Sequence, residues 1–178
     1  MTIATEQRRD ILIARFAALA ICIHLLEAAV PMPLPGVKPG LANVVILVAL
    51  LRYDFSLAAQ VLLLRVLGGS LLLGSFMTPT FWLSASGALA SLLVLGAVHV
   101  LARDSVSAIG LGIAAAMAHM AGQVFAAWLV FVPHPGILYL LPLLLTIALG
   151  LGLATGIIAA RLIEHLPPLE VASKPETA

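Results

Sequence analysis

Residues 105–160 read SVSAIGLGIAAAMAHMAGQVFAAWLVFVPHPGILYLLPLLLTIALGLGLATGIIAA and contain no Asp, Glu, Lys or Arg. One bilayer-spanning helix needs only about 20 such residues. Residues 66–102 are also without a formal charge, and the whole chain is 62% hydrophobic and 10% charged. Soluble domains carry about 25% charged residues. The sequence therefore predicts an all-α protein that crosses a membrane several times.

Polar turns and Pro/Gly-rich loops divide the apolar sequence into six segments. The second segment is short and is expected to cross only where neighbouring helices line its path. The predicted helices are Ile11–Val30, Leu41–Leu51, Phe55–Leu73, Phe81–Ala102, Ala108–Val132 and Ile137–Ile163. They form one membrane domain, 11–163, between a cytoplasmic N-terminal segment, 1–10, and a disordered cytoplasmic tail, 164–178.

The orientation is predicted from the distribution of Lys and Arg, which favour the cytoplasmic side. With six crossings, the side of the two termini holds Arg8, Arg9, Arg52, Arg103, Arg161 and Lys174. The opposite side holds only Lys38. Both termini are therefore expected in the cytoplasm.

Several function classes are not supported by the composition. The net charge is +1 with no basic run, so a nucleic-acid partner is not expected. Cys22 is the only cysteine, which excludes an internal disulfide. The aspartates, Asp10, Asp54 and Asp104, are isolated, so no Asp-rich Mg²⁺ site is present, and there is no Walker motif. The chain alone is not expected to be catalytic, and its residues indicate no metal or cofactor.

Polar side chains inside the predicted helices are the candidate site, because such residues are costly in lipid and usually functional. Arg65 lies too deep to reach the interface and requires an anion, either Glu27 or a ligand. His24 and Glu27 share one helix face at i, i+3, and His119 and Gln123 share another at i, i+4. Gln60 is a further candidate. Most of these residues lie between the midplane and the outer side, as expected for an outward-facing pocket.

The loop before the second helix predicts an anion site. The start of that helix presents free N–H groups, and Lys38 comes just before it. Asn43 lies in its first turn. The alternative is a rigid connector without a ligand.

Four motifs then resemble the heptaprenyl diphosphate synthase component I family, also named the Gx transporter family. They are Gly36-Val-Lys-Pro-Gly-Leu-Ala-Asn43, Leu64-Arg-Val-Leu-Gly-Gly-Ser70, Gly74-Ser-Phe-Met-Thr-Pro79 and Ala118-His-Met-Ala-Gly-Gln123. The chain departs from the family at Pro39, where leucine is usual, and at Met120, where asparagine is frequent.

The resemblance implies a fold similar to the substrate-binding S-components of energy-coupling factor transporters. Such a protein binds a small anionic or amphipathic ligand from outside a bacterial inner membrane. It relies on separate coupling and ATPase subunits. Ala14 and Ala18 match the small-residue spacing with which S-components dock their coupling subunit.

Two alternatives remain. The family's name implies a non-catalytic membrane partner of a polyprenyl (heptaprenyl) diphosphate synthase. Some relatives instead resemble membrane subunits of flavin-linked electron transfer, which would imply a flavoprotein partner and a quinone or flavin cofactor.

Overall fold

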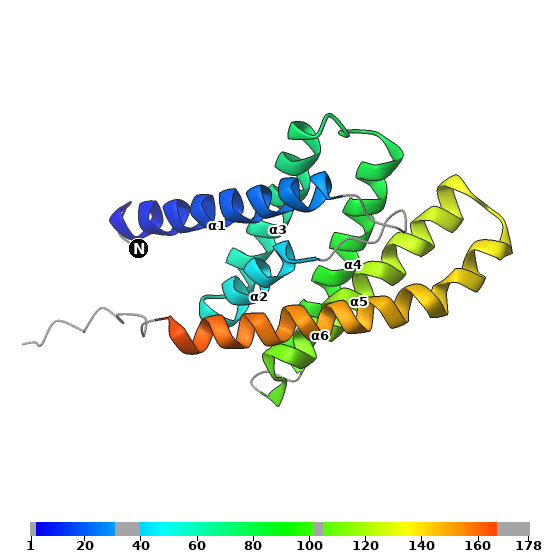
Figure 1. The fold of residues 1–178 in the computed structure, drawn as a ribbon. Helices are drawn as coiled ribbons and strands as arrows, with labels where there is room; N and C mark the ends of the chain where they lie inside the picture. The colour runs from blue at the N-terminus through cyan, green and yellow to red at the C-terminus, as the bar shows by residue number, and fades with distance from the viewer. Residues whose placement is uncertain (1–2, 31–39, 102–104, 167–178) are drawn as a thin grey trace, which may run out of the picture.

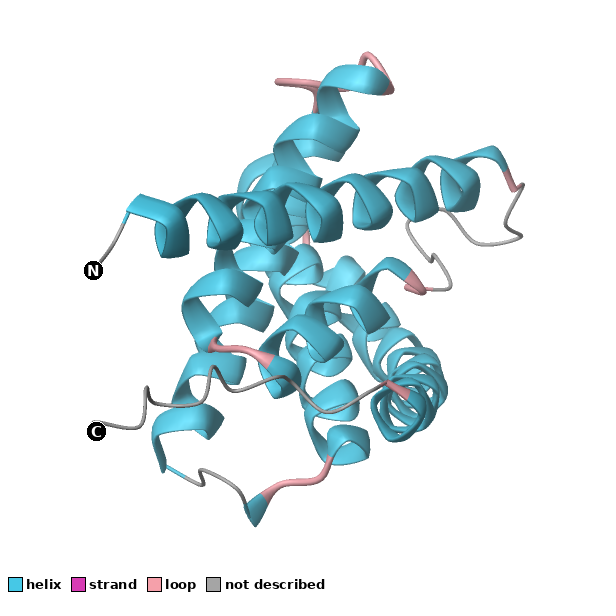
Figure 2. Cartoon of the chain, turned by 90° about the vertical axis from the view of Figure 1, so that its left-hand side faces the viewer, coloured by secondary structure: helices cyan, strands magenta, loops and turns pink. Residues whose placement is uncertain are grey.

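The computed structural model describes residues 3–30, 40–101 and 105–166, and this part of the chain is helical without strands (Figures 1 and 2). Its α-helices are α1 (Ile3–Ala29), α2 (Ala42–Arg52), α3 (Phe55–Leu72), α4 (Pro79–Leu101), α5 (Ala108–Ala126) and α6 (Leu141–His165). All except α2 belong to helical stretches that are long and apolar enough to cross a membrane. The predicted all-α membrane fold is confirmed.

Some helix bounds differ from those of the predicted apolar segments. Helix α1 begins at Ile3, so the polar residues before Ile11 are already helical. The segment predicted to start at Ile137 begins as a 3-10 helix, Pro135–Leu140, and Pro142 has no N–H with which to continue an α-helical bond to Leu138 O. At the other end, α6 continues to His165, past the predicted end at Ile163. The rest of the predicted tail, 167–178, lies outside the described residues.

Helix α2 is the central element of the bundle. Its 11 residues would extend about 16 Å, roughly half of the hydrocarbon core. Residues 44–50 are all buried, unlike those of a lipid-facing helix. The helix is in contact with α1, α3, α5 and α6. Its neighbours therefore shield α2 from lipid.

Glycines set the close packing of α5 against α6. A Cβ added to Gly112 would lie 2.6 Å from the Gly152 carbonyl oxygen and 2.8 Å from the Gly156 Cα. The absence of side chains here lets the two backbones approach directly, as small residues do in membrane helix pairs. The Gly152-xxx-Gly156 spacing therefore lies at a helix–helix interface.

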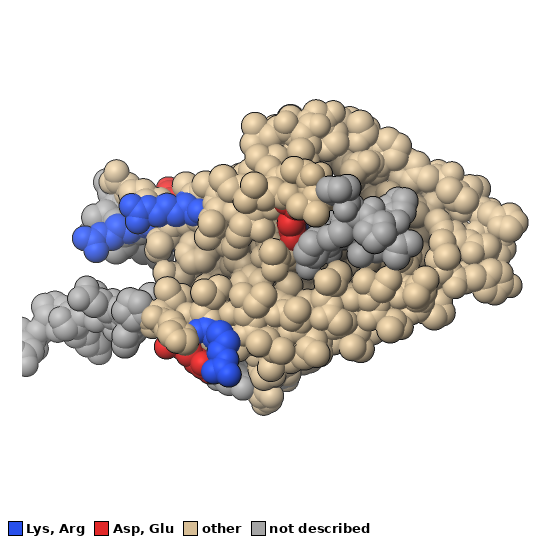
Figure 3. Space-filling view, viewed as in Figure 1, with Lys and Arg blue, Asp and Glu red and all other residues tan. Residues whose placement is uncertain are grey.

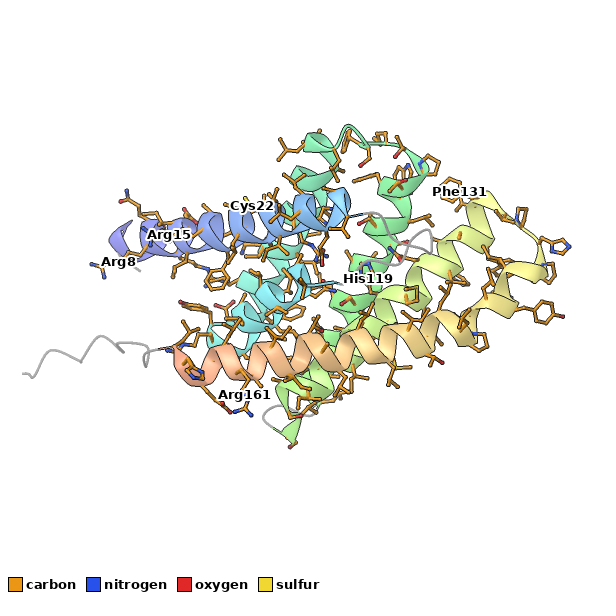
Figure 4. The ribbon with its side chains drawn as sticks, in the orientation of Figure 1. Arg8, Arg15, Cys22, His119, Phe131 and Arg161 are labelled. Carbon is orange, nitrogen blue, oxygen red and sulfur yellow. The ribbon has the colours of Figure 1, made fainter. Side chains whose placement is uncertain are left out.

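Charged side chains gather at the end of the molecule where α1 begins and α6 ends (Figures 3 and 4). Arg8 and Arg15 lie on α1, and Arg161 lies near the end of α6 (Figure 4). At the same end, Arg9 forms a salt bridge of 3.1 Å with Asp54. The Asp54 carboxylate also accepts a hydrogen bond of 2.8 Å from Leu57 N–H and so caps α3. This end is the one for which the Lys and Arg distribution predicts a cytoplasmic location.

Candidate functional site

A cavity of about 410 Å³ lies between the helices and takes lining residues from all six of them. The lining residues from α5 and α6, such as His119 and Leu151, fall near the middle of those helices, and Figure 4 places His119 inside the bundle. The polar part of the lining is His24, Glu27, Asn43, Arg65, Thr80, Ser84, His119, Gln123 and Thr155. The cavity is therefore a polar site within an otherwise apolar membrane domain.

Arg65 brings a fixed positive charge into this cavity. The residue is 6% exposed, and its Nη1 donates a hydrogen bond of 2.7 Å to Asn43 Oδ1. A guanidinium has five N–H donors, so this bond uses only part of its capacity. In the described part of the chain, no enclosed side-chain nitrogen or oxygen lacks a hydrogen-bond partner. Arg65 also lines the cavity, and a guanidinium there suits an oxyanion.

Glu27 contributes the opposite charge and is also 6% exposed. Its Oε1 accepts a hydrogen bond from Leu41 N–H, immediately before α2. Glu27 also acts electrostatically on Arg65. The carboxylate thus links the end of α1 to the start of α2, while Asn43 links that start to Arg65 on α3.

Two glycines of the Leu64–Ser70 motif bring α1 against α3. An added Cβ would lie 2.7 Å from the Ile21 side chain at Gly68 and 2.7 Å from the His24 ring at Gly69. These missing side chains leave room for His24, one turn before Glu27, at the edge of the cavity. The motif therefore supplies both a cation that lines the cavity, Arg65, and the surface on which α1 packs.

Glycines also bring the motif Ala118–Gln123 of α5 close to α4. His119 and Gln123 both line the cavity. A Cβ added to Gly87 of α4 would lie 2.9 Å from His119 Nε2 and 2.7 Å from Gln123 Cγ. Gly122 packs against α4 as well, since its Cβ would be 2.9 Å from the Ser86 carbonyl oxygen. The glycines on both helices therefore determine where the two polar side chains lie.

Six of the seven residues predicted as ligand contacts surround this one cavity: His24, Glu27, Asn43, Arg65, His119 and Gln123. The seventh, Lys38, lies outside the described residues. Gln60 is not part of the lining; it is exposed on α3 and donates to Ser56 Oγ. That these residues bind a ligand stays a prediction.

Sequence reasoning missed the hydroxyls that line the cavity, Thr80, Ser84 and Thr155. A serine or threonine in a helix can satisfy itself on a preceding carbonyl, as Thr155 does on Gly152 O at 3.1 Å. Its presence in an apolar helix is therefore a weak sign of a site. The i, i+4 spacing of Thr80 and Ser84, which puts both on one helix face, was the sequence signal for these cavity residues.

No group of three or more His, Cys, Asp or Glu suited to a metal ion occurs in residues 3–30, 40–101 and 105–166.

Gly87→Ala is expected to weaken ligand binding about tenfold without any contact to the ligand. The new Cβ would lie 2.8 Å from the His119 carbonyl oxygen as well as against the His119 and Gln123 side chains, so α5 must shift along with them. Such overpacking costs about 1–3 kcal/mol. The measurement is the amount of small molecule retained per purified protein. Gly96→Ala on the same helix, where the Cβ meets only the Phe55 ring at 3.0 Å, is the matched control. Equal retention by the two variants would contradict this role for Gly87.

The family model of heptaprenyl diphosphate synthase component I matches residues 16–162 of the chain. The match includes the second half of α1, the helices α2 to α5, nearly all of α6 and every residue that lines the cavity. No curated protein and no solved structure matches the chain. The similarity to S-components therefore stays a prediction.

Proposed function

The chain belongs to the heptaprenyl diphosphate synthase component I family, and from this premise we propose that it is a membrane-embedded binding and transport subunit. Its ligand is a small anionic or amphipathic molecule held in the Arg65 cavity. The observation that carries the proposal is the convergence of polar side chains from six helices on one cavity in an apolar membrane domain. Ligand sites between membrane helices have this composition, because polar groups at that depth are retained only where they are used.

The chemistry of the lining supports the class of ligand. Arg65 and Asn43 form one polar corner that suits a carboxylate or another oxyanion, and His119 and Gln123 offer further hydrogen bonds. The remaining walls are apolar: Leu83, Ala116, Met120, Ala148 and Leu151. A cavity of about 410 Å³ is at the small end of the range for small-molecule sites. These features favour a compact molecule with an anionic end and an apolar body.

The positions of the arginines support entry of the ligand from the side of the membrane opposite the two termini. Arg8, Arg15 and Arg161 lie at the terminal end of the bundle (Figure 4), the end expected in the cytoplasm. The cavity lies beyond the start of α2, towards the other end, and Gly40 and Asn43 at that start belong to its lining. In this proposal the ligand enters from outside a bacterial inner membrane.

The surface of α1 supports a partner subunit. Ala14 and Ala18 are both exposed, because α1 packs on α2 and α3 with its other side. A coupling subunit that brings ATP hydrolysis would dock on these alanines in the same way as for S-components. In this proposal, ATP hydrolysis by such partner subunits supplies the energy for transport.

The family name favours a second candidate, a membrane accessory of a polyprenyl diphosphate synthase. In that case the partner performs the diphosphate chemistry, and the cavity binds the anionic end of a prenyl substrate or product.

Purification from the native host in mild detergent, followed by mass spectrometry of small molecules and proteins, tests both candidates. We expect a bound small anion together with coupling and ATPase subunits. Recovery of a prenyl synthase with a prenyl diphosphate would favour the second candidate. A cavity that stays empty, with neither kind of partner, would contradict both.

A further inference from the structure

The start of α2 is already occupied by an anion, the side chain of Glu27. Helix N-termini attract negative charge through free N–H groups and the helix dipole. Here Leu41 N–H donates to Glu27 Oε1. The next available amides are also used, because Asn43 N–H donates to Gly40 O at 2.8 Å and Val44 N–H donates to Leu41 O at 3.0 Å. Ala42 is fully buried.

These contacts occupy the N–H groups of Leu41, Asn43 and Val44. A ligand oxyanion can bind Leu41 N–H only if the Glu27 carboxylate leaves it. Arg65 lies next to the same helix end through its bond to Asn43, and it acts electrostatically on Glu27. Both groups that would attract a ligand anion therefore also attract Glu27.

We propose that the start of α2 and Arg65 form one oxyanion subsite in which Glu27 is a tethered competitor that the ligand's oxyanion replaces. This inference rests on the proposed binding function and identifies the ligand group as a carboxylate or a similar oxyanion. Glu27 then has two roles. It neutralises the buried Arg65 and caps α2 while the cavity is empty, and it lowers the affinity for every anion that enters.

Exchange of one oxyanion for another leaves the start of α2 capped. The bond from Leu41 N–H is retained, with a ligand oxygen in place of Glu27 Oε1, and Arg65 keeps an anionic neighbour. The exchange requires the Glu27 carboxylate to give up its bond to Leu41 N–H and its other contacts. Arg65 is already held in place by Asn43, which reduces the entropic cost of binding an oxyanion.

The test uses acetate as the probe, because it has the carboxylate that Glu27→Ala removes. We expect acetate to raise the melting temperature of Glu27→Ala by several degrees, whereas chloride at the same ionic strength does not. Wild-type protein, whose subsite is filled, should show no such difference. The double variant Glu27→Ala/Arg65→Gln should lose the response. Equal melting temperatures in acetate and chloride for Glu27→Ala would overturn the proposal.

A second measurement separates this inference from the proposed function. The native small molecule is expected to dissociate about tenfold more slowly from Glu27→Gln, which keeps an oxygen for Leu41 N–H but loses the charge. Glu27→Asp is one methylene shorter and reaches Leu41 N–H less well, so it is also expected to bind the native small molecule more tightly than wild type does. Loss of the molecule in both variants would show that Glu27 holds the ligand, which overturns the competitor role but leaves the binding function intact. If the Glu27 variants and Arg65→Gln all retain the small molecule as wild type does, the proposed binding function itself is contradicted.

Discussion

Arg65→Gln is expected to weaken binding of the native ligand about 30-fold or more. The substitution removes the fixed charge of the cavity and leaves the polar corner around Asn43 without its guanidinium. Loss of a buried, hydrogen-bonded charge at a binding site costs about 2–5 kcal/mol, and about 1.4 kcal/mol corresponds to a factor of ten. The glutamine side chain ends two bonds short of the Arg65 Nη1 position, so its amide reaches Asn43 Oδ1 only if these side chains shift.

The measurement is native mass spectrometry of purified protein, with gel filtration to show that the variant remains folded. Arg15→Gln is the matched control, because Arg15 is an exposed arginine on α1 outside the cavity. Arg65→Lys should retain ligand at an intermediate level, since an ammonium keeps the charge but cannot form the two parallel hydrogen bonds of a guanidinium. Full retention by a folded Arg65→Gln protein would remove Arg65 from the site.

Gly112→Ala is expected to cause the largest loss of stability among single methyl additions on α5. The new Cβ would lie within 2.6–2.9 Å of Gly152 O and of Gly156 Cα and N, which are backbone atoms that cannot rotate away. The helices must separate, and the expected cost is about 3 kcal/mol, at the upper end for overpacking.

Thermal unfolding in detergent measures this effect. Gly150→Ala provides the control, because its Cβ would meet nothing within 4 Å. That variant should unfold at the wild-type temperature or slightly above it, since alanine favours a helix more than glycine does. If the two variants unfold together, the α5–α6 interface does not depend on close backbone contact.

The sequence was sufficient to predict the membrane domain and the clustering of its polar residues. Both follow from one physical cause, which is that lipid excludes polar side chains from the outside of a bundle. Arg65, Glu27 and His119 lie deep in apolar helices, so they had to turn inward, and residues at similar depth then meet. Gln60 departs from the rule because it lies near the polar end of α3, where it bonds to Ser56.

The detailed contacts could not be predicted from the sequence. The bond from Leu41 N–H to the Glu27 carboxylate joins residues that are 14 positions apart, and it depends on how α1 crosses α2. The sequence suggested an Arg65–Glu27 pair or a ligand for Arg65, whereas the structure gives Arg65 a bond to Asn43 as well. Helix crossings are determined by glycines such as Gly69 and Gly87, and these are recognised only when their neighbours are known.

The shortness of α2 has a consequence for biosynthesis. An apolar segment of 11 residues is too short to be recognised by the insertion machinery as an independent span. We expect α2 to enter the bilayer together with α3, as a helical hairpin closed at Tyr53 and Asp54, and to reach its final depth only after α5 and α6 have surrounded it. Because α5 and α6 also line the cavity, the cavity is complete only when both helices have packed against α2.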